Sequence, residues 1–259
     1  MSLNTPVRDW SSQRVWVVGA SSGIGLALAQ ALLARGARVA VSARRADPLN
    51  SLASRHPIHA LALPLDMVNN ADWDNAWARL KSEWQGVDWV VFCAADYTPI
   101  RAWELNRDRA AQLIELNLTG TLRGVSTVLP DFLKQGAGGI ALVASVAGYM
   151  GLPKSLVYGP TKAALINFAE SLYLDVKPKG LDVCVINPGF VATPLTAQND
   201  FDMPALMTPE AAALEIIAGL EHGEYEIHFP KRFTRVLRLI RRLPDRLRLR
   251  VLARIAEKS

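Results

Sequence analysis

The sequence predicts an α/β protein with a doubly wound parallel sheet, helices on both faces of that sheet, and a basic amphipathic helical tail. Six short β-branched runs alternate with longer segments in which apolar residues recur at spacings of three and four. The runs are continuously apolar, which is typical of strands buried on both faces. The chain has 259 residues, 50% hydrophobic and 20% charged, which suits a single domain with a large core.

The elements follow one another as strand then helix, an order that predicts right-handed crossovers between parallel strands. The predicted strands are 15–18, 39–42, 59–63, 87–93, 139–144 and 181–186. Helical spacing is present in segments such as 25–33, 73–84, 107–118, 124–134 and 161–177. A sheet of this kind binds its ligand beyond the carboxyl ends of its strands, so functional residues are expected directly after each strand.

Charge divides the chain into a body, residues 1–230, and a tail, residues 231–259. The tail holds 11 Lys or Arg and two carboxylates, whereas the body holds 18 basic and 22 acidic residues. The net charge of +5 therefore belongs to the tail, and the body has the charge balance of a slightly acidic enzyme.

The sequence does not indicate a metal site, a disulfide framework, a membrane-spanning segment or a secretory signal. Cys93 and Cys184 stand far apart in apolar runs, so neither a metal cluster nor a disulfide framework is expected, and a reducing, cytoplasmic location is favoured. The longest mainly apolar stretch, 139–153, falls short of the roughly 20 residues that span a bilayer. Residues 1–10 lack the pattern of a secretory signal.

The turn after the first predicted strand is rich in glycine and opens a helix. Its sequence is Gly19-Ala20-Ser21-Ser22-Gly23-Ile24-Gly25. Glycines let the backbone turn sharply and approach a diphosphate closely, while the amides of the helix point at the phosphate. The turn therefore predicts a Rossmann-type dinucleotide site with contacts from Gly19, Ser21, Ser22, Gly23, Ile24 and Gly25.

This Gly-x-x-x-Gly-x-Gly spacing resembles that of the classical short-chain dehydrogenase/reductase family. Four further motifs match in order: Asn117 in Asn-Leu-Thr-Gly, Ser145 in Ala-Ser-Val-Ala-Gly, Tyr158-Gly-Pro-Thr-Lys162, and Pro188-Gly189-Phe190-Val191-Ala192-Thr193. The resemblance covers about residues 12–200. It implies a nicotinamide-dependent oxidoreductase that forms a homodimer or homotetramer.

The reaction itself explains why such residues are needed. Reducing a carbonyl requires hydride at carbon and a proton at oxygen, so the site needs an acid whose pKa is brought from about 10 toward neutrality. Tyr158 and Lys162 are four apart on one predicted helix, where the ammonium can favour the phenolate. The resemblance implies that Tyr158 is the acid/base, that Lys162 also holds the nicotinamide ribose, that Ser145 orients the carbonyl oxygen, and that Asn117 supports a proton-relay water.

Cofactor choice depends on the end of the second predicted strand. The acidic position of the family falls on Ala43, and Arg44 follows it. A carboxylate there would repel the 2′-phosphate of NADP, whereas a guanidinium binds it, so NADP(H) is expected in preference to NAD(H). The resemblance implies further cofactor contacts at Asp66, Ala94, Val191 and Thr193, besides the catalytic Asn117, Tyr158 and Lys162.

After the fourth predicted strand the chain departs from the family. The usual Asn-Asn-Ala-Gly is replaced by Phe92-Cys93-Ala94-Ala95, a change that bears on sheet packing more than on catalysis. Residues 194–208 have few regular signals and fit a lid over a hydrophobic substrate, with core packing as the alternative. The apolar residues behind this expectation are Leu195, Phe201, Met203, Leu206 and Met207 in the lid, with Tyr149 and Met150 near Ser145.

The tail shows two apolar faces at helical spacing, separated by Pro244. The first contains Phe233, Val236, Leu237, Ile240 and Leu243, and the second Leu247, Val251, Leu252 and Ile255, with arginines on the other faces. Packing on the body or a second subunit, peripheral contact with a membrane, and binding of an acidic partner stay open. Nucleic acid is not expected, because no fold signature or interleaved aromatic platform accompanies the charge.

The sequence as a whole predicts an NADP(H)-dependent oxidoreductase that interconverts a carbonyl and an alcohol on a hydrophobic substrate. Residues 1–230 would form one catalytic domain and residues 231–259 a helical extension. A 3-oxoacyl thioester reductase is the alternative enzyme. A cofactor-bound scaffold, or a membrane-surface binding protein with vestigial activity, is the alternative of another class.

Overall fold

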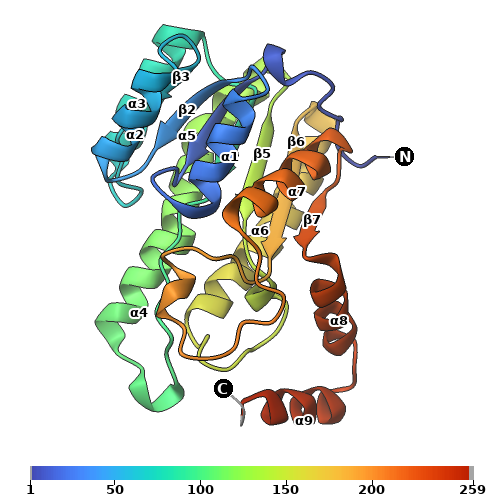
Figure 1. The fold of residues 1–259 in the computed structure, drawn as a ribbon. Coiled ribbons are helices and arrows are strands. Elements are labelled where there is room, and N and C mark those ends of the chain that lie inside the picture. The colour runs from blue at the N-terminus through green and yellow to red at the C-terminus, as the bar shows by residue number, and fades with distance from the viewer. Residues whose placement is uncertain (1, 257–259) are drawn as a thin grey trace.

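A seven-stranded parallel sheet lies between two layers of helices in the computed structural model, which describes residues 2–256 (Figure 1). The strand order is β3-β2-β1-β4-β5-β6-β7, so the order reverses between β1 and β4. The strands are β1 Arg14–Val18, β2 Arg38–Ser42, β3 Ala60–Ala62, β4 Trp89–Phe92, β5 Gly139–Val143, β6 Asp182–Pro188 and β7 Glu226–Phe229. The six predicted strands are all present, and the doubly wound fold is confirmed.

Strand β7 lies beyond the six predicted strands. It pairs with β6 at the edge of the sheet, and burial alternates along it, with Ile227 and Phe229 facing the core. A four-residue strand that contains Glu226 and His228 lacks the continuous apolar pattern by which the other strands are found.

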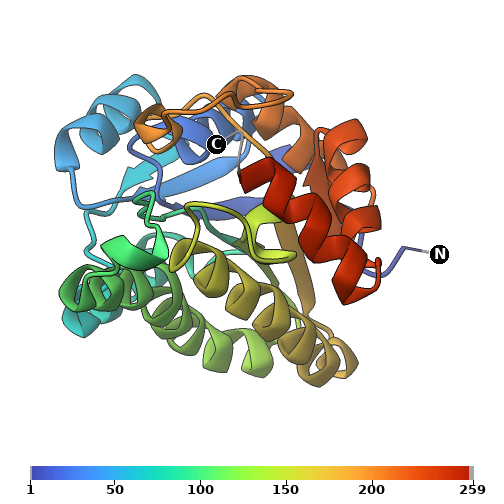
Figure 2. The same cartoon turned by 90° about the horizontal axis from the view of Figure 1, so that it is seen from below.

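Helices cover both faces of the sheet (Figure 2). On one face lie α1 Gly23–Leu33, α2 Ala46–Arg55 and α7 Pro209–Glu221, and on the other lie α3 Asn70–Trp84, α4 Arg107–Ile114, α5 Gly120–Gln135 and α6 Tyr158–Val176. Phe92, which replaces an asparagine of the family, is buried against Trp73, with ring centres 6.0 Å apart. A Cβ on Gly124 of α5 would come within 2.4 Å of both rings. Apolar side-chain packing thus stands in this part of the sheet where the family has a polar asparagine.

The tail forms two helices, α8 Lys231–Arg241 and α9 Asp245–Ala256, separated at Pro244. Phe233, Leu237 and Ile240 of α8 pack on the body around Val146 and Tyr149. Arg238 adds an ion pair to Glu226 of β7, at 3.5 Å. Residues 257–259 of the expected extension lie outside the described residues, and its division from the body at residue 230 stays a prediction.

Within residues 2–256, no helix has both the length and the hydropathy that crossing a bilayer requires.

Candidate active site

A cavity of about 580 Å³ lies over the carboxyl ends of β1 to β4, where the strand order reverses. The predicted cofactor contacts that line it are Gly19, Ser21, Ser22, Gly23, Ile24, Gly25, Arg44, Asp66, Ala94 and Thr193. Val191 does not line it, because it is buried and pairs with Met207. Asp66 also accepts a hydrogen bond from the Val68 amide at 3.2 Å, as a turn residue does. The glycine turn, the end of β2 and the end of β3 thus meet at one cavity.

The glycine turn leaves room for an anion. Gly19 and Gly23 adopt φ values of +97° and +57°, and a Cβ on Gly19 would lie 2.3 Å from the backbone nitrogen of Ala94. Helix α1 begins at Gly23, and the N-cap Ser22 makes no side-chain hydrogen bond to the first turn. The first amides of α1 are therefore left for a ligand, and a diphosphate fits such a helix N-terminus.

A second cavity, of about 310 Å³, adjoins the first and shares Leu195 with it. Ser145 and Tyr158 are on its wall, and Tyr97 faces it from the segment after β4. The remaining lining is mainly apolar and includes Leu152, Phe190, Phe201, Phe233, Leu237 and Ile255. We call this space the catalytic cavity.

Three of the four predicted catalytic residues lie where β5 and α6 meet. Ser145 follows β5 and accepts a hydrogen bond from the Ala147 amide at 3.1 Å. Tyr158 is the first residue of α6, and Lys162 follows one turn later. Lys162 is 1% exposed, and its ammonium donates to the backbone oxygen of Val143 at 2.8 Å and lies 5.5 Å from the centre of the Tyr158 ring.

Burial governs the protonation of this cluster. It raises the pKa of Tyr158 above that of a free phenol, with Ser145 acting in the opposite direction. Burial also lowers the pKa of Lys162 to about 8 and raises that of Cys93 to about 12. Burial is therefore the main influence on the Tyr158 pKa in the protein alone, and the expectation that Lys162 brings this pKa toward neutrality stays a prediction.

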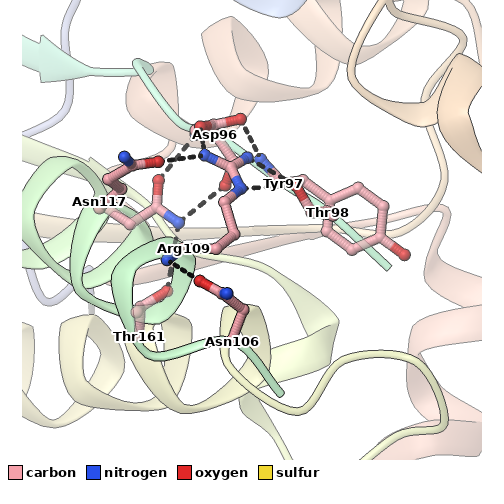
Figure 3. A network of polar contacts seen from close by, with 8 residues as sticks. Asp96, Tyr97, Thr98, Asn106, Arg109, Asn117 and Thr161 are labelled. Atoms are coloured by element: carbon pink, nitrogen blue, oxygen red, sulfur yellow. Dashed lines mark hydrogen bonds and ion pairs between the residues drawn. The ribbon is translucent and has the colours of Figure 1, made fainter. Parts of the chain in front are cut away.

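Asn117 holds the backbone that follows β4 (Figure 3). It is fully buried in a π-helical turn, η3 Glu115–Thr119, between α4 and α5. Its side-chain oxygen accepts from the Asp96 amide at 2.7 Å, and its side-chain nitrogen donates to the Asp96 carbonyl at 2.8 Å. The Asp96 carboxylate bonds the Tyr97 amide and pairs with Arg109, each at 2.8 Å. This network orients Tyr97, whereas the proton-relay role of Asn117 stays a prediction.

Tyr97 is a site residue that no sequence motif indicated. Its ring meets that of Tyr158 edge to face, with centres 5.1 Å apart, and its hydroxyl donates to the side-chain oxygen of Asn199 at 2.9 Å. Burial raises the pKa of Tyr97 to about 12. Its one sequence signal is its place directly after the fourth predicted strand.

Four of the apolar residues singled out near the catalytic motifs divide between the cavity wall and the contact with α8, whereas Leu206 is exposed and Met207 packs against the core. Leu195 and Phe201 of the expected lid line the catalytic cavity. Tyr149 and Met150 do not, because they pack against α8, and the Tyr149 hydroxyl donates to Glu226 at 2.6 Å. Phe233, Leu237 and Ile255 line the cavity instead, although the tail sequence indicated only their helical spacing. Among the described residues, no group of His, Cys, Asp or Glu side chains could hold a metal ion.

The chain is similar to known proteins over most of its length. Residues 13–203 match a family model described as short chain dehydrogenase. An uncharacterised oxidoreductase of Myxococcus xanthus is 35% identical over 242 residues, 92% of this chain and 96% of that one. One from Staphylococcus epidermidis is 33% identical, over 71% of this chain and 80% of its own length.

Solved structures show the same similarity. A short-chain dehydrogenase from Streptomyces avermitilis superposes with a TM-score of 0.80 at 25% identity, covering 87% of this chain and 91% of that one. One from Sphingobium yanoikuyae, in complex with NADPH, has a TM-score of 0.77 at 25% identity and covers 90% and 97% of the two chains.

Proposed function

The chain belongs to the short-chain dehydrogenase family, and we propose that it interconverts a carbonyl and an alcohol with NADP(H) as the hydride carrier. The observation that carries this proposal is the place of Tyr158 and Ser145. Both are on the wall of a mainly apolar cavity that adjoins the cavity of the glycine turn. A carbonyl carbon in the catalytic cavity would thus lie beside a dinucleotide in the first cavity.

The chain's own residues fit an NADP(H) molecule. The uncapped first turn of α1 would hold the diphosphate, and Arg44 lines the same cavity beyond the end of β2. Ala43 leaves that strand end without the carboxylate that would repel a 2′-phosphate. Arg45 lines this cavity too, where it donates to the Ser21 hydroxyl at 3.3 Å, so a second guanidinium lies beside Arg44. The NADPH-bound structure from Sphingobium yanoikuyae supports the same choice.

Each catalytic residue then has a separate task. The bound nicotinamide supplies the hydride. Tyr158 donates its phenolic proton to the carbonyl oxygen, and Ser145 orients that oxygen with its hydroxyl. The Lys162 ammonium, held by Val143, lowers the cost of the negative charge left on Tyr158. Asn117 keeps the segment after β4 in place, so that Tyr97 supports the Tyr158 ring.

The lining of the catalytic cavity favours an uncharged, hydrophobic substrate. It consists mainly of aromatic and aliphatic side chains, and among the described residues its charged member is Asp202, with no Lys or Arg. A carboxylate or phosphate close to the reacting carbon would find no counter-ion there. We therefore propose medium-sized ketones, aldehydes or the corresponding alcohols as substrates.

The experiment that tests this function is oxidation of NADPH, with NADH in parallel, against ketones, aldehydes, steroids and 3-oxoacyl thioesters. We expect turnover of an uncharged carbonyl compound with NADPH, and none with Tyr158→Phe. Activity confined to acyl thioesters would establish the 3-oxoacyl reductase instead. Tight NADPH binding without turnover of any compound would favour the cofactor-bound scaffold.

A further inference from the structure

Helix α9 crosses the end of the molecule at which the strands of the sheet finish (Figures 1 and 2). Its Leu252 is buried, and its Ile255 lines the catalytic cavity together with Phe233 and Leu237 of α8. One side of the tail is thus part of the wall of that cavity. Its other side faces away from the cavity and is exposed to solvent.

The outer side of α9 carries a row of exposed arginines. Arg246, Arg250 and Arg254 follow one another at a spacing of four, so they share one face of the helix, and all three are exposed. Arg248, on another face, pairs with Asp245 at 2.7 Å. Within residues 2–256, by contrast, no carboxylate pairs with any of the three.

Exposed leucines flank this row. Leu247 is 49% exposed and Leu249 is 60% exposed, although each is preceded and followed by a basic residue. Helix α8 repeats the arrangement, with Val236 and Leu239 more than half exposed on the side opposite Leu237. The basic residues beside them are Arg232, Arg235 and Arg242.

We propose that this outer surface of α8 and α9 binds the surface of an anionic lipid bilayer. Exposed leucines among exposed arginines match an interface in which apolar side chains enter the acyl boundary and guanidinium groups meet phosphates. Each basic side chain near an anionic surface adds to the attraction, and the row on α9 supplies three. An acidic protein would account for the arginines, but it would gain less from the separate leucines.

The binding surface has a consequence for the substrate. Because Ile255 and Leu237 belong both to the tail and to the wall of the catalytic cavity, membrane binding brings that cavity next to the acyl region. A hydrophobic carbonyl compound dissolved in the bilayer would then be concentrated close to the cavity. The binding itself depends only on the tail, not on the proposed reductase activity.

The test is cosedimentation of the full chain with phosphatidylcholine vesicles, with and without phosphatidylglycerol, at low and at high salt. The matched variants are Arg246→Gln/Arg250→Gln/Arg254→Gln and Arg8→Gln/Arg35→Gln/Arg55→Gln. Both remove three exposed positive charges, but Arg8, Arg35 and Arg55 lie toward the amino ends of the strands.

We expect binding to the anionic vesicles alone, weakening as salt rises, and at least about a tenfold loss of affinity in the α9 variant but not in its control. Leu249→Ala should weaken the binding that survives at high salt, because its contribution is hydrophobic. Equal losses in the two triple variants, or no binding of the unaltered protein to anionic vesicles at low salt, would overturn the proposal. Either result could be obtained while NADPH turnover is intact.

Discussion

The ammonium nitrogen of Lys162 lies 5.5 Å from the centre of the Tyr158 ring, where Lys162 is buried and Tyr158 is partly buried on the wall of the catalytic cavity. Spacing of four on α6 brings them together, and the backbone oxygen of Val143 holds the ammonium at 2.8 Å. Burial works against both charged forms, so proton transfer at this site is controlled by desolvation as much as by attraction between the two groups.

Removing the phenolic hydroxyl of Tyr158 should abolish turnover while NADPH still binds. Tyr158→Phe keeps the ring that packs on Tyr97 but leaves no proton for the carbonyl oxygen. We expect the rate of NADPH oxidation to fall about 10²–10⁴-fold, the usual worth of a positioned general acid. Fluorescence titration should show that the affinity for NADPH falls far less than the rate, because most of the expected cofactor contacts are kept. A variant with normal turnover would exclude Tyr158 as the acid.

Burial of Lys162 should make stability depend on pH. Its pKa is lowered from 10.5 to about 8, so the unfolded chain binds more protons than the folded one between these values. The free energy of unfolding should therefore rise from about pH 8 toward pH 10, by up to about 3 kcal/mol.

The control for this effect is Lys162→Met, which fills similar space without a charge. Both proteins are unfolded with denaturant across that pH range. The free energy of unfolding should rise with pH in the unaltered protein but not, through this group, in the Lys162→Met variant. If the difference in the free energy of unfolding between the two proteins did not change with pH, burial would not lower the pKa of Lys162.

The end of β2 should decide between the two nicotinamide cofactors. Arg44→Ala should raise the KM for NADPH about 10- to 100-fold, the worth of charged hydrogen bonds to a phosphate, and leave that for NADH unchanged. Ala43→Asp should reverse the preference, because its carboxylate would face the 2′-phosphate. Arg55→Ala, at the far end of α2, serves as the control. Equal effects on the two cofactors would contradict this role of Arg44.

Shortening Leu237 should change the KM for the substrate but not the KM for the cofactor. Leu237→Ala enlarges the catalytic cavity and should raise the KM for small ketones, with a stability loss of about 2–4 kcal/mol. Leu220→Ala is the matched control, because that leucine of α7 is buried away from the cavity. If both variants changed the KM alike, Leu237 would act through stability alone.

The sequence by itself determined six of the seven strands and the order of the catalytic motifs. Short continuous apolar runs between helical segments predict strands buried on both faces, and the glycine spacing between a strand and a helix predicts a phosphate-binding turn from neighbouring residues alone. The same holds for Tyr158 and Lys162, which share a face because four residues make about one helical turn. In these cases neighbours in the chain are neighbours in space.

The tertiary structure alone decided what surrounds those motifs. Periodicity predicted helices containing Phe233 and Ile255, but only the docking of the tail places both on the wall of the catalytic cavity. Tyr149 stands close to Ser145 in the sequence, yet Glu226 of β7 turns its hydroxyl away. The upward shift of the Tyr158 pKa likewise depends on desolvation by several segments at once. Packing and desolvation sum over residues distant in the chain, and sequence spacing does not record them.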